Sequence, residues 1–277
     1  MTVDGSAPGR LPADPVELLE LATPIATEVA ARLLAVVEGA GDEPRVSTKS
    51  GVTDLVTDLD RWAEGHITES LLESRPGDGL VGEEGASVTG TSGVDWCVDP
   101  IDGTVNFVHG IPGFCVSIAA QVEGRSVAAV VASPMHGDVF TATIGGGAQR
   151  NGRDIECSAT PGLQRAVIGT GFGYDPARRT RQAAVLQRVI ADIADIRRGG
   201  AAALDLCSVA CGRLDGYWEV GLNPWDHAAG ALIAAEAGAV VGDLRGGAPS
   251  GDFTLAAPPQ LWEPLRDLLT AAAADAV

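Results

Sequence analysis

Apolar residues near the N-terminus recur at the spacing of one helical face. They predict an amphipathic helix from Pro15 to about Glu38, carried by Leu18, Leu19, Leu21, Ile25, Val29, Leu33, Leu34 and Val37. A second helical pattern runs from Asp58 to about Ser74, and Asp58 or Asp60 is a suitable cap for it. Residues 1–14 are rich in Gly, Pro and Ala without periodicity, which predicts a flexible N-terminal tail.

The middle of the chain is patterned for β-structure. Short apolar or alternating runs bounded by Gly, Pro and Asn predict strands at Leu80-Val81, Val94–Val98, Cys115–Val122, Ser126–Ala132 and Asp138–Thr143. Glu123-Gly124 separates two of these runs by the length of a hairpin turn, so we expect an antiparallel or mixed sheet. Gly145–Gly147 and Asn151-Gly152 predict further turns.

Beyond Thr160 the pattern alternates between strands and helices. Strands are predicted at Val167–Thr170, Ile196-Arg197, Tyr217–Val220 and Val240-Val241. Helices are predicted at Ala177–Ala194, Ala202–Gly212, Trp225–Ala237 and Gln260 to about Ala274. The pattern therefore predicts an α+β part over residues 15–160 and an α/β part over residues 161–277, which together form a single compact unit.

Composition and charge narrow the classes of function. The formal net charge of −18 argues against nucleic acid or an anionic membrane as a partner, although a bound cation can still admit a phosphorylated substrate. No apolar run approaches the roughly 18 residues of a membrane span, and no signal-peptide pattern begins the chain. Five cysteines without a Cys-x-x-Cys pair fit reduced thiols, so we expect a cytoplasmic protein. Among 19 basic residues only Lys49 is lysine, which suits either a need for an ammonium group or chance.

The segment Asp99-Pro-Ile-Asp-Gly-Thr104 carries the strongest chemical signal. It brings Asp99 and Asp102 close together, and two like charges about 4 Å apart cost about 4 kcal/mol at an effective dielectric near 20. Mg²⁺ would relieve this repulsion, because it binds carboxylate and carbonyl oxygens and leaves positions for phosphate. The alternative is a plain turn, since Asp-Pro and Asp-Gly are common turn dipeptides. The segment alone does not decide between the two.

Other acidic residues each have an ordinary explanation when taken singly. Glu83 and Glu84 follow a predicted strand and suit an exposed acidic turn. Asp60 and Asp226 lie near predicted helix starts, where capping is the ordinary role. Glu219 would be an exposed strand residue. It is the order and type of the whole set that points to a shared site.

Three motifs in chain order resemble the inositol monophosphatase family of Mg²⁺-dependent, lithium-sensitive phosphatases, which are related to fructose-1,6-bisphosphatase. They are Gly-Glu-Glu at 82–84, Asp-Pro-Ile-Asp-Gly-Thr at 99–104 and Pro-Trp-Asp-x-Ala-Ala-Gly at 224–230, and the resemblance runs from about Lys49 to Val241. It implies a layered αβαβα sandwich. It also implies two or three Mg²⁺ ions held by Glu83, Asp99, the backbone carbonyl of Ile101, Asp102 and Asp226.

The resemblance further implies how substrate and water are held. Gly103 and Thr104 would bind the phosphate through backbone amides, and Thr104 with Asp60 and Glu83 would orient the attacking water. Contacts to the rest of the substrate would come from Asp102, Ala202, Glu219 and Asp226. Lys49 matches a lysine near the family's active site, and Glu84 is a further candidate beside Glu83.

The implied activity is hydrolysis of inositol-1-phosphate to myo-inositol and phosphate by metal-activated water, in a homodimeric enzyme. Gly199-Gly200-Ala201 and Asn223 depart from the commonest family pattern, and both are expected beside the substrate ring. Histidinol phosphate or another small polyol phosphate therefore stays open as the substrate. A non-catalytic regulatory member is a further alternative, disfavoured because none of the expected ligands is missing.

Overall fold

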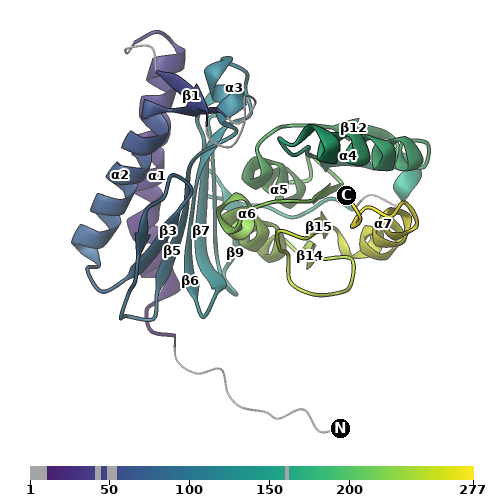
Figure 1. Cartoon of the computed structure of the whole chain (residues 1–277). Helices are drawn as coiled ribbons and strands as arrows, with labels where there is room; N and C mark the ends of the chain where they lie inside the picture. Colours follow the sequence, from purple (N-terminus) through teal and green to yellow (C-terminus); the bar gives the residue numbers. More distant parts are fainter. Residues whose placement is uncertain (1–10, 41–44, 49–54, 160–161) are drawn as a thin grey trace, which may run out of the picture.

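An eight-stranded sheet forms the larger half of the computed structural model, which describes residues 11–40, 45–48, 55–159 and 162–277 (Figure 1). Its strand order is β10-β9-β8-β7-β6-β5-β3-β4, and every neighbouring pair is antiparallel except the parallel pair β3 and β5. The strands are β3 (Gly79–Gly82), β4 (Ser87–Val88), β5 (Asp95–Asp102), β6 (Cys115–Val122), β7 (Arg125–Ser133), β8 (Asp138–Thr143), β9 (Gly147–Arg150) and β10 (Arg153–Asp154).

Two helices cover one face of this sheet (Figure 1). Helix α1 (Pro15–Val37) begins where the Asp14 carboxylate accepts a hydrogen bond from the Val16 amide at 2.9 Å, with Pro15 in its first turn. Helix α2 (Asp58–Ser74) follows the short antiparallel pair β1 (Val46–Thr48) and β2 (Leu55–Thr57). Their apolar sides pack with buried sheet residues that include Trp96, Val116 and Ile118. The burial of this face fixes the register of the central strands.

A five-stranded mixed sheet forms the second half, in the order β12-β11-β13-β15-β14. Strand β11 is parallel to β12 and β13, whereas β15 is antiparallel to both β13 and β14. The strands are β11 (Val167–Thr170), β12 (Asp195–Arg197), β13 (Gly216–Glu219), β14 (Val240–Gly242) and β15 (Thr254–Ala257). Helices α4 (Pro176–Val189) and α7 (Pro259–Ala271) share a hydrophobic cluster with this sheet.

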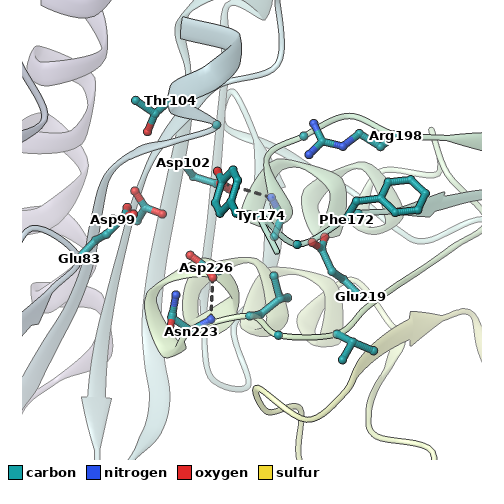
Figure 2. Close-up of a pocket in the computed structure, with 18 of the residues that line it drawn as sticks. Glu83, Asp99, Asp102, Thr104, Phe172, Tyr174, Arg198, Glu219, Asn223 and Asp226 are labelled. Carbon is teal, nitrogen blue, oxygen red and sulfur yellow. Dashed lines mark hydrogen bonds between the residues drawn. The ribbon is translucent and has the colours of Figure 1, made fainter. Parts of the chain in front are cut away.

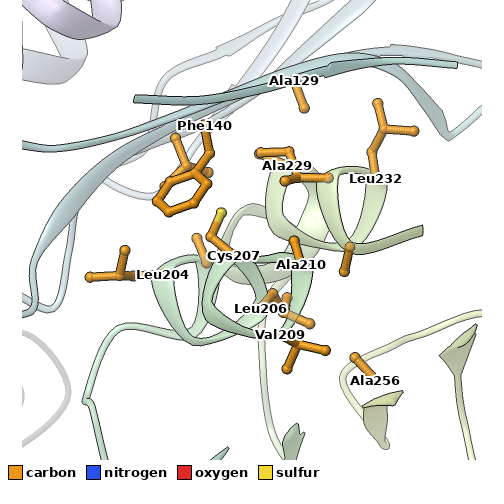
Figure 3. Close-up of a cluster of buried hydrophobic side chains, with 14 of the residues drawn as sticks. Ala129, Phe140, Leu204, Leu206, Cys207, Val209, Ala210, Ala229, Leu232 and Ala256 are labelled. Atoms are coloured by element: carbon orange, nitrogen blue, oxygen red, sulfur yellow. The ribbon is translucent and has the colours of Figure 1, made fainter. Parts of the chain in front are cut away.

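Helices α5 (Ala202–Ala210) and α6 (Pro224–Glu236) lie between the two sheets (Figure 1). Small side chains from both helices meet Phe140 of the large sheet and Ala256 of the small one (Figure 3). At Gly230 of α6, an added Cβ atom would lie only 2.8 Å from the Ala203 carbonyl oxygen, so the two helices pack at backbone distance. The layers run helix, sheet, helix, sheet, helix, and the expected αβαβα sandwich is confirmed.

Several local expectations were wrong. The N-cap of α2 is Thr57 and not Asp58 or Asp60. The Thr57 hydroxyl accepts hydrogen bonds from the Leu59 and Asp60 amides. Strands β1, β2, β4, β9, β10 and β15 and the short helix α3 (Thr104–Val108) lie where no such element was expected. Most are too short for a periodic signal. The expectation for the tail falls largely on residues 1–10, outside the described residues, and Lys49 lies outside them as well.

Candidate active site

A bulge at the end of β5 builds the centre of the site. Against β6, Asp99 pairs with Ser117 and Asp102 pairs with Cys115, so three steps along β5 oppose two along β6. Within the bulge, Asp99 Oδ1 accepts a hydrogen bond from the Ile101 amide at 3.1 Å. The segment from Asp99 to Asp102 is therefore a bulged strand rather than the plain turn that its dipeptides also suited. Asp99 and Asp102 both line one pocket.

Gly103 joins the bulge to α3 in a conformation that requires glycine. Its φ is +88°, and a Cβ atom there would lie 2.8 Å from the Gly113 carbonyl oxygen and 3.2 Å from that of Gly200. Gly103 and Thr104 both line the pocket beside Asp102. Any side chain at position 103 would push the neighbouring loops apart.

Thr104 connects the pocket to a carboxylate behind it. Its hydroxyl lies 3.0 Å from the Ile101 carbonyl oxygen and 3.3 Å from Asp60 Oδ1, which are two acceptors for its single proton. Asp60 is fully buried, and its Oδ2 accepts from the Thr57 amide at 2.7 Å and the Thr57 hydroxyl at 2.6 Å. The helix cap thus fixes Asp60, and Asp60 fixes Thr104.

Glu83 and Asp99 lie next to each other at one side of the pocket (Figure 2). Burial raises the pKa of the Asp99 carboxyl well above its ordinary value, and the charges of Glu83, Asp102 and Asp226 raise it further. Glu83 emerges directly after β3, and its amide donates to the Val98 carbonyl of β5 at 3.2 Å. The pairing of the two strands therefore brings the two carboxylates together.

Asp102 ties the large sheet to α5. Its carboxylate accepts hydrogen bonds from the amides of Ala203 at 2.7 Å and Ala202 at 3.2 Å, in the first turn of that helix. The cap position Ala201 offers no side-chain acceptor, so a residue distant in sequence caps α5. Burial raises the pKa of Asp102, as does the charge of Asp226, while the Ala203 amide opposes the rise.

Asp226 lies at the start of α6, in the helical layer between the two sheets. Its Oδ2 accepts a hydrogen bond from the Asn223 amide at 2.6 Å, which closes the first turn of the helix (Figure 2). Both residues line the same pocket as Asp99. The acidic residues of the site therefore come from both halves of the chain.

The far end of the pocket is formed by Glu219 and Arg198 (Figure 2). Burial raises the pKa of Glu219, although the hydrogen bond that Tyr217 donates at 2.6 Å and the charge of Arg198 oppose the rise. A Cβ atom at Gly171 would overlap the Glu219 carboxylate, so any side chain there would displace that carboxylate. This end offers both an acceptor and a cation to the part of a substrate farthest from Asp99.

Sequence reasoning missed Arg198 and the loop from Gly171 to Tyr174. Tyr174 lines the pocket and is exposed, and Phe172 lies two residues earlier in the same loop (Figure 2). The glycines at 171 and 173 and the position directly after β11 were the available signal, because loops at strand ends commonly form sites.

The comparison with known proteins decides the family. The model of the inositol monophosphatase family matches residues 14–276. The chain belongs to the inositol monophosphatase family. The resemblance inferred from the three motifs is thereby confirmed, and phosphatase chemistry is the activity that this family membership supports.

Named relatives within the family fall into two groups. The chain is 45% identical over 244 residues to an inositol-1-monophosphatase of Mycobacterium leprae, covering 82% of this chain and 84% of the relative. It is 42% identical over 217 residues to a Nus factor SuhB of Vibrio cholerae, covering 76% and 81%. The crystal structure of an extragenic suppressor protein suhB from Bartonella henselae matches with a TM-score of 0.86 and 38% identity, over 91% of this chain and 98% of that one.

The inositol monophosphatase fold gathers most of the predicted site residues in one pocket. These are Glu83, Asp99, Ile101, Asp102, Gly103, Thr104, Ala202, Glu219 and Asp226. Asp60 does not line the pocket and reaches it through Thr104. Glu84 is likewise absent from the lining, and its backbone amide instead donates to Glu64 at 2.7 Å. No helix within the described ranges is long and apolar enough to span a membrane.

Members of this family are generally metal-dependent, and the donors here suit a hard cation. Five acidic residues and Ile101 line the pocket, and burial together with the charges of Glu83, Asp102 and Asp226 raises the pKa of Asp99. Among the residues that the structure describes, no three His, Cys, Asp or Glu side chains are already arranged as a metal cage. The donor set therefore suits a hard divalent cation by its chemistry and charge.

Proposed function

We propose that this protein is a Mg²⁺-dependent phosphomonoesterase that hydrolyses inositol-1-phosphate to myo-inositol and phosphate. The observation that carries the proposal is one pocket lined by Glu83, Asp99, Asp102 and Asp226 together with the Gly103-Thr104 turn. Carboxylates alone would repel a phosphate, so a phosphatase site of this composition needs cations. Glu83, Asp99, Ile101, Asp102 and Asp226 are the residues that would hold them.

Bound Mg²⁺ would supply charge neutralisation for the phosphate and a more acidic water. The protein's own groups would do the positioning. The amides of Gly103 and Thr104 would hold the phosphate oxygens. Because the Thr104 hydroxyl can donate a hydrogen bond to Asp60 Oδ1, its lone pairs would be left to accept a hydrogen bond from the attacking water, and Glu83 would accept a second one. Hydrogen bonds from Thr57 would hold Asp60 in place as one of the two acceptors of this hydroxyl.

Contacts at the far end of the pocket would select the substrate. Glu219 would accept hydrogen bonds from ring hydroxyls, held in place by the Tyr217 hydroxyl. Ala202 and Asp102 line the same pocket and would contact the rest of the substrate. A polyol suits this surface because its hydroxyls both donate to carboxylates and accept from amides.

A substrate panel tests the proposal. Inositol-1-phosphate, histidinol phosphate, fructose-1,6-bisphosphate and 3′-phosphoadenosine 5′-phosphate are compared by kcat/KM at saturating Mg²⁺, with and without tens of millimolar Li⁺. We expect inositol-1-phosphate to give the highest value and Li⁺ to inhibit. A dominant histidinol-phosphate value would replace the substrate assignment while leaving phosphatase chemistry intact.

A second candidate function follows from the relatives named Nus factor SuhB. A regulatory role without catalysis would keep the fold and lose the chemistry. The net charge of −18 opposes direct contact with RNA. Undetectable phosphate release with all four substrates would support this candidate and overturn the first.

A further inference from the structure

A buried glutamate lies behind the turn that carries Glu83. Glu64 sits in the middle of α2 and is 5% exposed. Its Oε2 accepts a hydrogen bond from the Glu84 amide at 2.7 Å, and its Oε1 accepts one from the Ala86 amide at 2.8 Å. Both oxygens of one side chain therefore bind the backbone of a segment 20 or more residues away in sequence.

The backbone amides of this turn can be followed one by one. Those at Gly82 and Gly85 are bonded within the turn, to the carbonyls of Ala86 at 2.8 Å and Gly82 at 3.4 Å. The Glu83 amide donates to β5, and the remaining two, of Glu84 and Ala86, donate to Glu64. Without Glu64, two amides on the inner side of the turn would lose their acceptor.

The approach of α2 to the turn is close. A Cβ atom at Gly82 would overlap the Glu64 carboxylate, so the end of β3 rests directly on this side chain. Glu83 is the next residue along the chain. A change in the length or charge of residue 64 would therefore act on the backbone that orients the Glu83 carboxylate.

We propose that Glu64 is a positioning residue for cation binding: its carboxylate clamps the β3–β4 turn so that Glu83 faces Asp99. The proposal rests on the proposed function, because it assigns Glu83 to the cation site. Glu64 is not itself placed as a ligand, since both of its oxygens bind backbone amides and it does not line the pocket.

A role in folding alone would give a different result from a positioning role. Loss of packing or hydrogen bonds would lower the free energy of unfolding and leave the affinity of the folded protein for Mg²⁺ unchanged. A positioning role lowers that affinity, and residues that orient metal ligands typically contribute about 10–100-fold to it. The decisive measurement is therefore a binding constant on folded protein.

The test uses Glu64→Gln, which keeps the shape but turns one acceptor into a donor facing an amide. Glu69→Gln is the matched control, because it makes the same change at an exposed position of the same helix. Chelator-stripped full-length proteins are titrated with MgCl₂ by calorimetry in about 0.15 M KCl, which screens non-specific attraction to the acidic surface. Urea unfolding establishes that each variant is folded.

We expect Glu64→Gln to bind Mg²⁺ at least about 10-fold more weakly than the wild type, and Glu69→Gln to match the wild type. Half-maximal activity should require correspondingly more Mg²⁺, with KM for substrate unchanged at saturating metal. If Glu64→Gln does not fold, Glu64→Asp replaces it, since it retains the charge but withdraws the carboxylate by one methylene. The affinity of Glu64→Asp for Mg²⁺ should also fall.

The outcomes separate the two proposals. Equal Mg²⁺ affinity of wild type and a folded position-64 variant would overturn the role of Glu64 and leave the proposed function standing. A wild-type protein that does not bind Mg²⁺ would overturn the metal-dependent mechanism, and the role of Glu64 with it.

Discussion

Individual carboxylates in this pocket lie where burial and neighbouring negative charges disfavour their ionised form. Asp99 is almost completely buried and faces the charges of Glu83, Asp102 and Asp226, which is why its pKa is raised. Residues that are unfavourable for the isolated fold are characteristic of functional sites. Asp99 should therefore contribute to activity and detract from the stability of the metal-free protein.

Replacing Asp99 by Asn separates these two effects. Without its charge, we expect kcat to fall about 1,000-fold, equivalent to about 4 kcal/mol. In EDTA, urea unfolding should show that the free energy of unfolding of the same variant is about 1 kcal/mol higher than that of the wild type. Asp95→Asn, at the exposed start of the same strand, is the control and should change neither property. Near-full activity of Asp99→Asn would contradict the assigned role.

Asp205 gives a prediction for pH. It is buried near Glu219, with the amides of Gly199 and Gly200 donating to it, and burial raises its pKa to about 8. An unfolded Asp has a pKa of about 3.9. Between these pKa values the native state holds a proton that the unfolded state has released. The contribution of Asp205 to the free energy of unfolding is therefore complete below about pH 4 and is lost as pH rises towards 8.

The matching experiment compares the wild type with Asp205→Asn in EDTA from pH 5 to pH 7. Asp205 should add a slope of about −1.4 kcal/mol per pH unit to the free energy of unfolding, and the variant should lack it. Asp99, Asp102 and Glu219 titrate in both proteins, so the difference between the curves isolates Asp205. Parallel curves would mean that Asp205 is already ionised in the native protein.

At the scale of elements, the long helices and central strands were predictable from the sequence. The contacts that join elements distant in sequence were not. Helix α1 and strands β6 and β8 have enough alternating or periodic residues to be read directly. The bulge at Asp99 and the capping of α5 by Asp102 depend on contacts between distant segments. The same holds for the clamp of Glu64 on the β3–β4 turn. The chemistry was thus readable from local motifs, whereas the placement of the side chains required the tertiary structure.

One such junction joins β8, β9 and the segment after α5. The buried Asp138 carboxylate accepts hydrogen bonds from Arg150 and Arg213, both at 2.7 Å. Burial alone would raise the pKa of Asp138, but the two guanidinium groups hold it below its ordinary value. Its contribution to stability is therefore present above about pH 4 and is lost as pH falls through the lowered pKa.

Asp138→Asn should lower the free energy of unfolding at pH 7 by about 2 kcal/mol, because it removes the charge of a buried carboxylate that is hydrogen-bonded to two partly exposed guanidinium groups. Asp267→Asn breaks an exposed pair with Arg266 and should cost less than about 1 kcal/mol. Urea unfolding of both variants makes the comparison. Equal effects would show that Asp138 has no more structural importance than a surface charge.

At the scale of the whole molecule, the layered sandwich makes a site that neither half contains alone. The large sheet supplies Glu83, Asp99 and Asp102, whereas α6 supplies Asp226 and β13 supplies Glu219. Family resemblance also led us to expect a homodimer. Light scattering coupled to size exclusion should give twice the chain mass at micromolar concentration. A monomer mass over that range would refute the dimer.

The division of carboxylates between the two halves has a consequence for the protein's lifetime. A cation held by Asp99 and Asp226 would act as a reversible crosslink, and ligands that bind only the native state add RT ln(1 + [L]/Kd) to its stability. At free Mg²⁺ 100 times Kd this amounts to about 2.7 kcal/mol, which lowers the unfolded population about 100-fold. Proteases act on that population. Abundance of this phosphatase would then follow the free Mg²⁺ concentration around it, independently of how fast the bound ion lets it turn over substrate.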